Sequence, residues 1–257
     1  MSKRMLWALV GSCALLTLAI PSHAQSSDVK EKPALYSYVS HWAIPRAHWA
    51  DMQKADESDN EILEKALADG TIVGYGHDET MVHQADSGTH DDWWEAHSMA
   101  GLLKVLDQFY ASGSTTSDPL TSATAHSDTI SVSHYYNWKP GPYKNAYTHV
   151  STYQLKPDAP DDAVDTLSKT LVVPLLEKLL DDGTLLEYEV DTEAIHTTDP
   201  SYFWIIYTVA SPDGLDKVNA ALGEAVKAQP LAGPAFGSMT ASKSHRDDLI
   251  RGDGVYK

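Results

Sequence analysis

The sequence predicts an α+β protein that contains two tandem copies of one βαββαβ unit. Two runs of 21 residues, Leu63 to His83 and Leu176 to His196, are identical at ten positions with a constant offset of 113 residues. Shorter identities lie on both sides of these runs, and the same order of strand and helix patterns occurs in each half. Self-similarity of this kind indicates a duplicated domain, and two copies are too few for a solenoid.

The elements of the first copy follow from its local patterns. Leu35 to Ile44 is rich in aromatic and β-branched residues, which favours a strand. The next helix is expected to end at Asp69, because Gly70 suits the left-handed backbone found just past a helix end. The later elements are expected as strands at Thr71 to Tyr75, Asp92 to Ala96 and Thr129 to Tyr135, with a helix starting near Ser98.

The second copy has clearer helix and strand signals. Apolar residues at helical spacing predict a helix whose buried face comprises Val164, Leu167, Leu171, Leu175 and Leu179. Tyr202 to Val209 is almost continuously apolar, as expected for a strand that is covered on both faces. Ser211 is a suitable N-cap for the following helix, and the last strand is expected at Ser238 to Ser244.

The chain is predicted to divide into a signal segment and two repeats. A basic start, an apolar run from Leu6 to Ile20 and a small-residue ending at Ala24 are typical of a cleaved export signal. The predicted division is 1–24 signal peptide, 25–136 first repeat, 137–146 linker and 147–257 second repeat. We therefore expect an exported bacterial protein, periplasmic or secreted, whose mature chain lacks cysteine because Cys13 lies in the signal.

The charge limits the partners of the protein. The chain has 36 acidic and 19 Lys or Arg residues, for a net charge of −17. Phosphate backbones bind through Lys and Arg clusters, so nucleic acid is not expected as a partner. We expect no membrane contact once the signal is cleaved, because no second apolar run is long enough to cross a bilayer.

A βαββαβ unit that occurs twice, with a helix–Asp-Gly-Thr–strand join in each copy, resembles the dimeric α/β-barrel superfamily. This ferredoxin-like group includes antibiotic-biosynthesis-monooxygenase-like and EthD-like proteins. The resemblance covers about Leu35 to Arg246 and is one of topology, without a catalytic motif. It implies two ferredoxin-like units packed sheet to sheet as a pseudo-symmetric α/β barrel, either as a monomer with an internal pseudo-dimer or as a homodimer.

Histidine is the enriched reactive residue type. The chain has 12 histidines, and eight of them lie in the first repeat, which favours that repeat as the site of chemistry. The candidate proton-transfer residues are His41, His83 and Tyr75. Two histidines recur at equivalent positions. Face-to-face packing of the copies would set the second-strand edge of one near the fourth strand of the other, and would bring His83 toward His245 and His196 toward His134. Paired imidazoles suit zinc, copper or iron, but preservation of two solvent-facing strand-end histidines by descent is the favoured interpretation.

Aromatic residues form the candidate ligand-binding group. Tyr36, Tyr38 and Trp42 share one face of the first strand, because side chains alternate along a strand. Trp93 and Trp94 belong to a neighbouring strand, so the five are expected to line an apolar cleft between the sheet and the helices. An ordinary aromatic core is the competing interpretation.

Two functional hypotheses remain open from the sequence. The first is an exported protein that binds a small aromatic or apolar ligand in the sheet–helix cleft; by analogy of fold, cofactor-independent monooxygenase-like chemistry is conceivable, with no cofactor expected. The second is a non-catalytic structural or interaction protein, and a third, minor hypothesis is a metal or haem bound by histidine. An apolar cleft open to solvent would favour the first hypothesis, and a fully packed interior would favour the second.

Overall fold

The computed structural model describes residues 29–84, 87–197 and 201–257. The predicted signal peptide, residues 1–24, lies outside the described residues.

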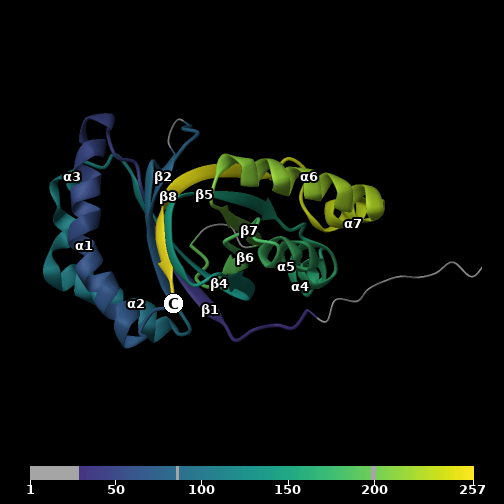
Figure 1. The fold of residues 1–257 in the computed structure, drawn as a ribbon, viewed down its shortest axis with the longest axis horizontal. Helices are drawn as coiled ribbons and strands as arrows, with labels where there is room; N and C mark the ends of the chain where they lie inside the picture. The colour runs from purple at the N-terminus through teal and green to yellow at the C-terminus, as the bar shows by residue number, and fades with distance from the viewer. Residues whose placement is uncertain (1–28, 85–86, 198–200) are drawn as a thin grey trace, which may run out of the picture.

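In this described part, the strands form one closed antiparallel barrel with the order β1-β3-β2-β8-β5-β7-β6-β4 (Figure 1). The strands are β1 (Leu35–Trp42), β2 (Gly74–Thr80), β3 (His90–Ala96), β4 (His126–Trp138), β5 (Gly141–Gln154), β6 (Glu187–Glu193), β7 (Tyr202–Val209) and β8 (Arg246–Tyr256). Each copy contributes four adjacent strands, and the two sheets join where β2 pairs with β8 and β4 pairs with β6. The predicted fold class is confirmed, and both halves of the barrel come from a single chain.

Helices cover the outside of the barrel on two opposite sides (Figure 1). The first sheet carries α1 (Trp49–Asp69), α2 (Met99–Ser112) and α3 (Asp118–Thr121), and the second carries α4 (Ala163–Leu167), α5 (Val173–Asp181), α6 (Pro212–Ala228) and α7 (Ala232–Met239). A π-helical turn at Ser168–Val172 joins α4 to α5, where Pro174 cannot donate a backbone hydrogen bond. Among the described residues, no helix combines the length and the apolarity needed to cross a membrane.

Alternation along the strands separates an outer core from the interior of the barrel. In the first copy, Tyr38, Tyr75 and Trp94 point outward and pack with Leu102 of α2 in one buried cluster. Their neighbours in sequence point into the barrel, because successive side chains of a strand face opposite sides. Trp93 fits inside because Gly76 and Gly254 face it: a Cβ at Gly76 would lie 2.5 Å from the Trp93 ring.

Two predicted boundaries are wrong. Of the predicted linker, residues 137–146, only Lys139 and Pro140 lie between strands, since β4 extends to Trp138 and β5 begins at Gly141. The Tyr143 hydroxyl donates to the Lys139 carbonyl at 2.6 Å and holds this turn.

The last strand is also displaced from its predicted position. Residues 238–244 are not the strand: α7 ends at Met239, and β8 begins at Arg246. The polar sequence of β8 gave no strand signal, because its inward side chains face a polar cavity rather than a hydrophobic core.

Candidate functional site

The interior of the barrel contains a cavity of about 650 Å³, which we call the lumen. All eight strands of the barrel contribute alternate residues to its wall. This size is within the range of small-molecule sites, roughly 300–1,000 Å³. The lumen is therefore the candidate functional site of the described structure.

A histidine–aspartate pair lies in the lumen wall on two neighbouring strands. His41 of β1 is directly opposite Asp91 of β3, and the His41 Nδ1 lies 2.7 Å from the Asp91 Oδ1. Asp91 is buried, whereas the His41 side chain keeps 37% of its surface exposed. Burial opposes protonation of His41, but the hydrogen bond to Asp91 and the negative charges of Asp91, Asp128 and Asp248 together outweigh it and raise the pKa of His41 above its ordinary value. The pair leaves Nε2 of His41 as the ring atom that can exchange a proton with a bound molecule.

Four buried carboxylates form an acidic cluster farther along the lumen. The acidic cluster comprises Glu95 of β3 and Glu187, Glu189 and Asp191 of β6, each at most 6% exposed. The Tyr256 hydroxyl donates to the Glu95 Oε1 at 3.0 Å, and the Thr208 hydroxyl donates to the Glu187 Oε2 at 2.8 Å. Three oxygens in this cluster are buried without a hydroxyl or N–H donor: Glu95 Oε2, Glu189 Oε1 and Asp191 Oδ1. The Glu189 carboxyl is within hydrogen-bond contact of the Glu95 and Asp191 carboxyls.

The acidic cluster holds its protons more strongly than exposed carboxylates do. Burial raises the pKa of Glu187 to about 7. Burial, followed by the charge of Glu187, raises the pKa of Glu95 well above its ordinary value, and burial together with the charge of Glu95 does the same for Glu189. Near neutral pH, the cluster therefore carries less negative charge than four free carboxylates.

Aromatic rings complete the wall of the lumen. Trp93, Tyr143 and Tyr256 lie beside the acidic cluster, with the Trp93 and Tyr256 ring centroids 5.5 Å apart. Tyr202 and Trp204 of β7 line another part of the cavity. The lumen thus combines flat apolar surfaces with carboxylates and one histidine.

The structure separates the three predicted proton-transfer residues. His41 lines the lumen, as described above. Tyr75 lies on the opposite face of the sheet in the outer core, where burial raises the pKa of its hydroxyl. His83 is exposed in the loop after β2, and its ring lies 5.0 Å from that of Trp49. The roles of these residues remain predictions, and only His41 lies beside the cavity.

Four of the five predicted ligand-binding aromatics face the helices. Tyr38 stacks on Trp94 with centroids 4.3 Å apart, and Tyr36 packs against the same cluster. Trp42 packs against the cluster around Ile44. Only Trp93 lines the lumen, so the cavity lies on the side of the sheet opposite to the one that these residues indicated.

The second strand of each copy pairs with the fourth strand of the other, as β2 with β8 and as β6 with β4. The four histidines of the metal hypothesis nevertheless contact other groups. The His245 ring stacks on Tyr153 at 4.5 Å, and the His134 Nδ1 lies 3.0 Å from the Lys32 carbonyl oxygen. His196 is exposed after β6, and His83 contacts Trp49. A metal role for these residues stays a prediction.

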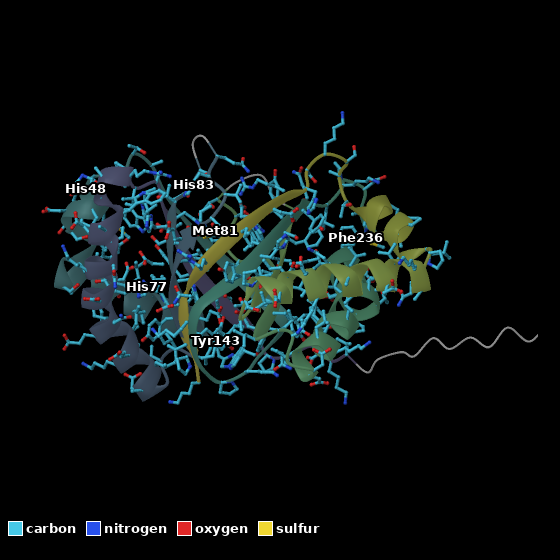
Figure 2. All side chains as sticks on the ribbon, turned by 45° about the horizontal axis from the view of Figure 1, so that its top comes forward. His48, His77, Met81, His83, Tyr143 and Phe236 are labelled. Carbon is cyan, nitrogen blue, oxygen red and sulfur yellow. The ribbon has the colours of Figure 1, made fainter. Side chains whose placement is uncertain are left out.

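A different group of metal-ligand residues lies outside the barrel, between α1 and the first sheet. Asp56, His77 and Asp92 have side-chain atoms within 4.8 Å of one another, the one such group of three found among the described residues. Figure 2 labels His77 on this side of the barrel. The His77 Nδ1 lies 2.8 Å from the Asp92 Oδ1, and its Nε2 lies 3.2 Å from the Asn60 Oδ1. Both ring nitrogens therefore face oxygen acceptors, and the Asp56 Oδ1 lies 3.8 Å from the same Nδ1, as expected for a charged imidazolium.

We expect His77→Ala to destabilise the protein by about 1–3 kcal/mol near pH 6 and by much less near pH 10. Burial opposes protonation of His77, but the hydrogen bond to Asp92 and the negative charges of Asp92, Asp56 and Asp59 together outweigh it and raise the His77 pKa to about 9 from 6.5. Stability from a raised histidine pKa is complete below the unfolded value of 6.5 and is lost as the pH rises through about 9. Urea unfolding of both proteins at the two pH values measures the difference. His97→Ala, at an exposed histidine, is the control, and an equal loss at both pH values would contradict the imidazolium assignment.

No protein-family model and no curated protein matches the chain at the sequence level. Solved structures do resemble it. A proposed monooxygenase from Lactobacillus acidophilus aligns with a TM-score of 0.62 at 9% identity, over 85% of this chain and 94% of the other. A proposed monooxygenase from Fusobacterium nucleatum aligns with a TM-score of 0.59 at 8% identity, over 88% and 95% of the two chains.

A proposed chlorite dismutase also aligns, with a TM-score of 0.52 at 12% identity over 85% of this chain and 94% of the other. At such identities the likeness concerns the fold alone. The chain thus has the dimeric α/β-barrel fold that the resemblance implied.

Sequence reasoning missed the acidic cluster. The run EYEVDTE of β6 places acids at every second position, so one face of that strand is acidic. In the run HDDWWEA of β3, Asp91 and Glu95 lie four residues apart and therefore share a face. Neighbouring acids are common in so acidic a chain. Acids at every second position of one strand are the signal that could have identified this cluster, because such residues share a face of the sheet.

Proposed function

We propose that this protein binds a small aromatic molecule with an ionisable hydroxyl in the barrel lumen, where His41 accepts its proton. The observation that carries the proposal is the His41–Asp91 pair, 2.7 Å apart, in the wall of a cavity of about 650 Å³. An open cavity also favours ligand binding over the purely structural hypothesis. If the predicted signal peptide is cleaved on export, this binding takes place outside the cytoplasm.

The pair has the geometry of a general base with an orienting carboxylate. Asp91 accepts a hydrogen bond from the Nδ1 of His41, so it selects the tautomer in which Nε2 carries a lone pair. Trp93, Tyr202 and Trp204 supply flat surfaces against which an aromatic ring packs. Since the pKa of His41 is raised, its action as a neutral base requires a pH above that raised value.

Monooxygenase-like chemistry extends the proposal by analogy with the two structural neighbours described as monooxygenases. In a cofactor-independent reaction, a substrate with a CH₂ group activated by an aromatic ring reacts as its enol tautomer, whose hydroxyl proton His41 accepts. The resulting enolate reduces O₂ in two stages. Overall CH₂ becomes C=O with one oxygen atom, and the other leaves as water with the two hydrogens, so four electrons move from carbon to oxygen.

Haem does not suit this lumen. Its two propionates need cationic partners, but Arg246 is the one Lys or Arg in the described cavity wall, and it already pairs with Asp248 at 3.1 Å. The acidic cluster would repel the propionates further. The proposal accordingly uses no cofactor.

Binding of 4-nitrophenol tests the proposal, because its ionised form absorbs visible light apart from the protein. We expect saturable quenching of tryptophan fluorescence, since Trp93 and Trp204 line the lumen. At one pH above neutrality, bound 4-nitrophenol should be more ionised in the wild type than in His41→Ala. His97→Ala, at an exposed histidine, should behave as the wild type does. Absence of saturable binding, or an equal ionised fraction in His41→Ala, would refute the assignment.

A further inference from the structure

The acidic cluster is a costly feature for an empty barrel. Its four side chains are buried, and three of their oxygens have no hydroxyl or N–H donor from the protein. Burying a carboxylate is costly, and buried charges are normally paired with a cation or bound to a metal. Nothing in the fold requires acids there, since barrels of this size are commonly filled by apolar side chains.

No side chain of the described lumen supplies the missing positive charge. Arg246 is bound to Asp248 and keeps 60% of its side chain exposed, and His41 is bound to Asp91. His41 also lies four strand positions from Glu95 in the β1–β3 register, which is about 13 Å along the strands. The side chains of the described lumen therefore leave the acidic cluster without a cationic partner.

Aromatic rings beside the cluster add a second feature of cation sites. The Tyr256 ring is 5.6 Å from that of Tyr143 and 5.5 Å from that of Trp93. Rings that border buried carboxylates attract organic cations through their negative faces as well as through contact area. A bare metal ion suits the cluster less well, because the cluster is not among the described groups whose carboxylate atoms lie within 4.8 Å of one another.

We propose that the acidic cluster binds a cationic amine carried by the ligand, with N–H donors directed at the unpaired oxygens of Glu95, Glu189 and Asp191. This inference rests on the proposed function, because it assigns the second end of the same ligand. The hydroxyl end lies at His41 and the ammonium end lies at the acidic cluster. The ligand class is then a small hydroxyaromatic amine.

Two commercially available phenols separate the two proposals. Tyramine carries a phenol and a primary ammonium group, and 4-propylphenol has nearly the same shape without the charge. We expect calorimetry to show that the wild type binds tyramine about 10- to 100-fold more tightly than 4-propylphenol, as hydrogen bonds to charged groups predict. In Glu189→Gln this ratio should fall below about threefold.

The control for Glu189→Gln is the same substitution at an exposed glutamate. Glu224→Gln changes an exposed glutamate of α6 that pairs with Lys227, and it should keep the wild-type ratio. Circular dichroism confirms that each variant is folded. Equal affinity of the wild type for both phenols, or an unchanged ratio in Glu189→Gln, overturns the ammonium assignment and leaves the phenol site standing. Binding of neither phenol overturns both.

Discussion

Replacing Gly252 by alanine is expected to lower the free energy of unfolding by about 3 kcal/mol. Gly252 lies in β8 opposite Asp78 of β2, at the junction between the two copies. An added Cβ would overlap the Asp78 side chain and would lie 2.3 Å from the His77 carbonyl oxygen. Because one of these neighbours is backbone, rotation of a side chain cannot relieve the clash. Urea unfolding at one pH measures the loss.

A second glycine provides the matched control for this effect. Gly223 lies within α6, and a Cβ there would meet no heavy atom within 4 Å. Gly223→Ala should stabilise the protein by about 0.5–1 kcal/mol, because alanine favours the helix over the unfolded chain. A similar effect of the two substitutions would show that the β2–β8 junction tolerates a side chain. That result would contradict the register in which Gly252 lies opposite Asp78.

The duplication made most of the fold predictable. Two copies of a βαββαβ pattern with an identical helix–Asp-Gly-Thr–strand join gave the architecture, and antiparallel pairing of β2 with β8 and of β4 with β6 follows from closing two such sheets. The failures fell on segments that line the lumen. Because β8 carries acids and glycines inward, its composition resembles a loop although it pairs with a strand on each side.

The candidate site was only partly predictable, for a related reason. Alternation showed that Tyr36 and Tyr38 share a face, but periodicity does not say which face of a sheet packs on helices and which encloses a cavity. Apolar character suggested a ligand surface, whereas in the structure that face is the outer core. The lumen is more polar than the core. In a chain with 36 acidic residues, the acids that face the lumen do not stand out in the sequence. His41 was a candidate, and its partner Asp91 depends on strand register, which the sequence does not supply.

Raising the pH from about 5 to about 9 is expected to lower the free energy of unfolding of the wild type by several kcal/mol. Burial raises the pKa of Glu187 in the folded protein to about 7 from 4.5. A carboxylate with a raised folded-state pKa is equally protonated in both states at low pH, so it costs nothing there. As the pH rises from 4.5 through about 7, the unfolded chain releases the proton more readily, and stability falls. Since one pKa unit corresponds to about 1.4 kcal/mol, this single group contributes roughly 3 kcal/mol.

Glu187→Gln isolates this contribution from the loss that His77 adds over the same range. The amide keeps an oxygen that can accept from Thr208 but has no proton to lose. We expect the variant to match the wild type near pH 5 and to exceed it by about 2–3 kcal/mol near pH 9, as measured by urea unfolding. Glu224→Gln, at an exposed position, should follow the wild-type curve throughout. Parallel curves for wild type and Glu187→Gln would mean that Glu187 is not held protonated by burial. A stabilised Glu187→Gln barrel would show that the native sequence gives up stability to keep a carboxylate in the lumen, as functional sites commonly do.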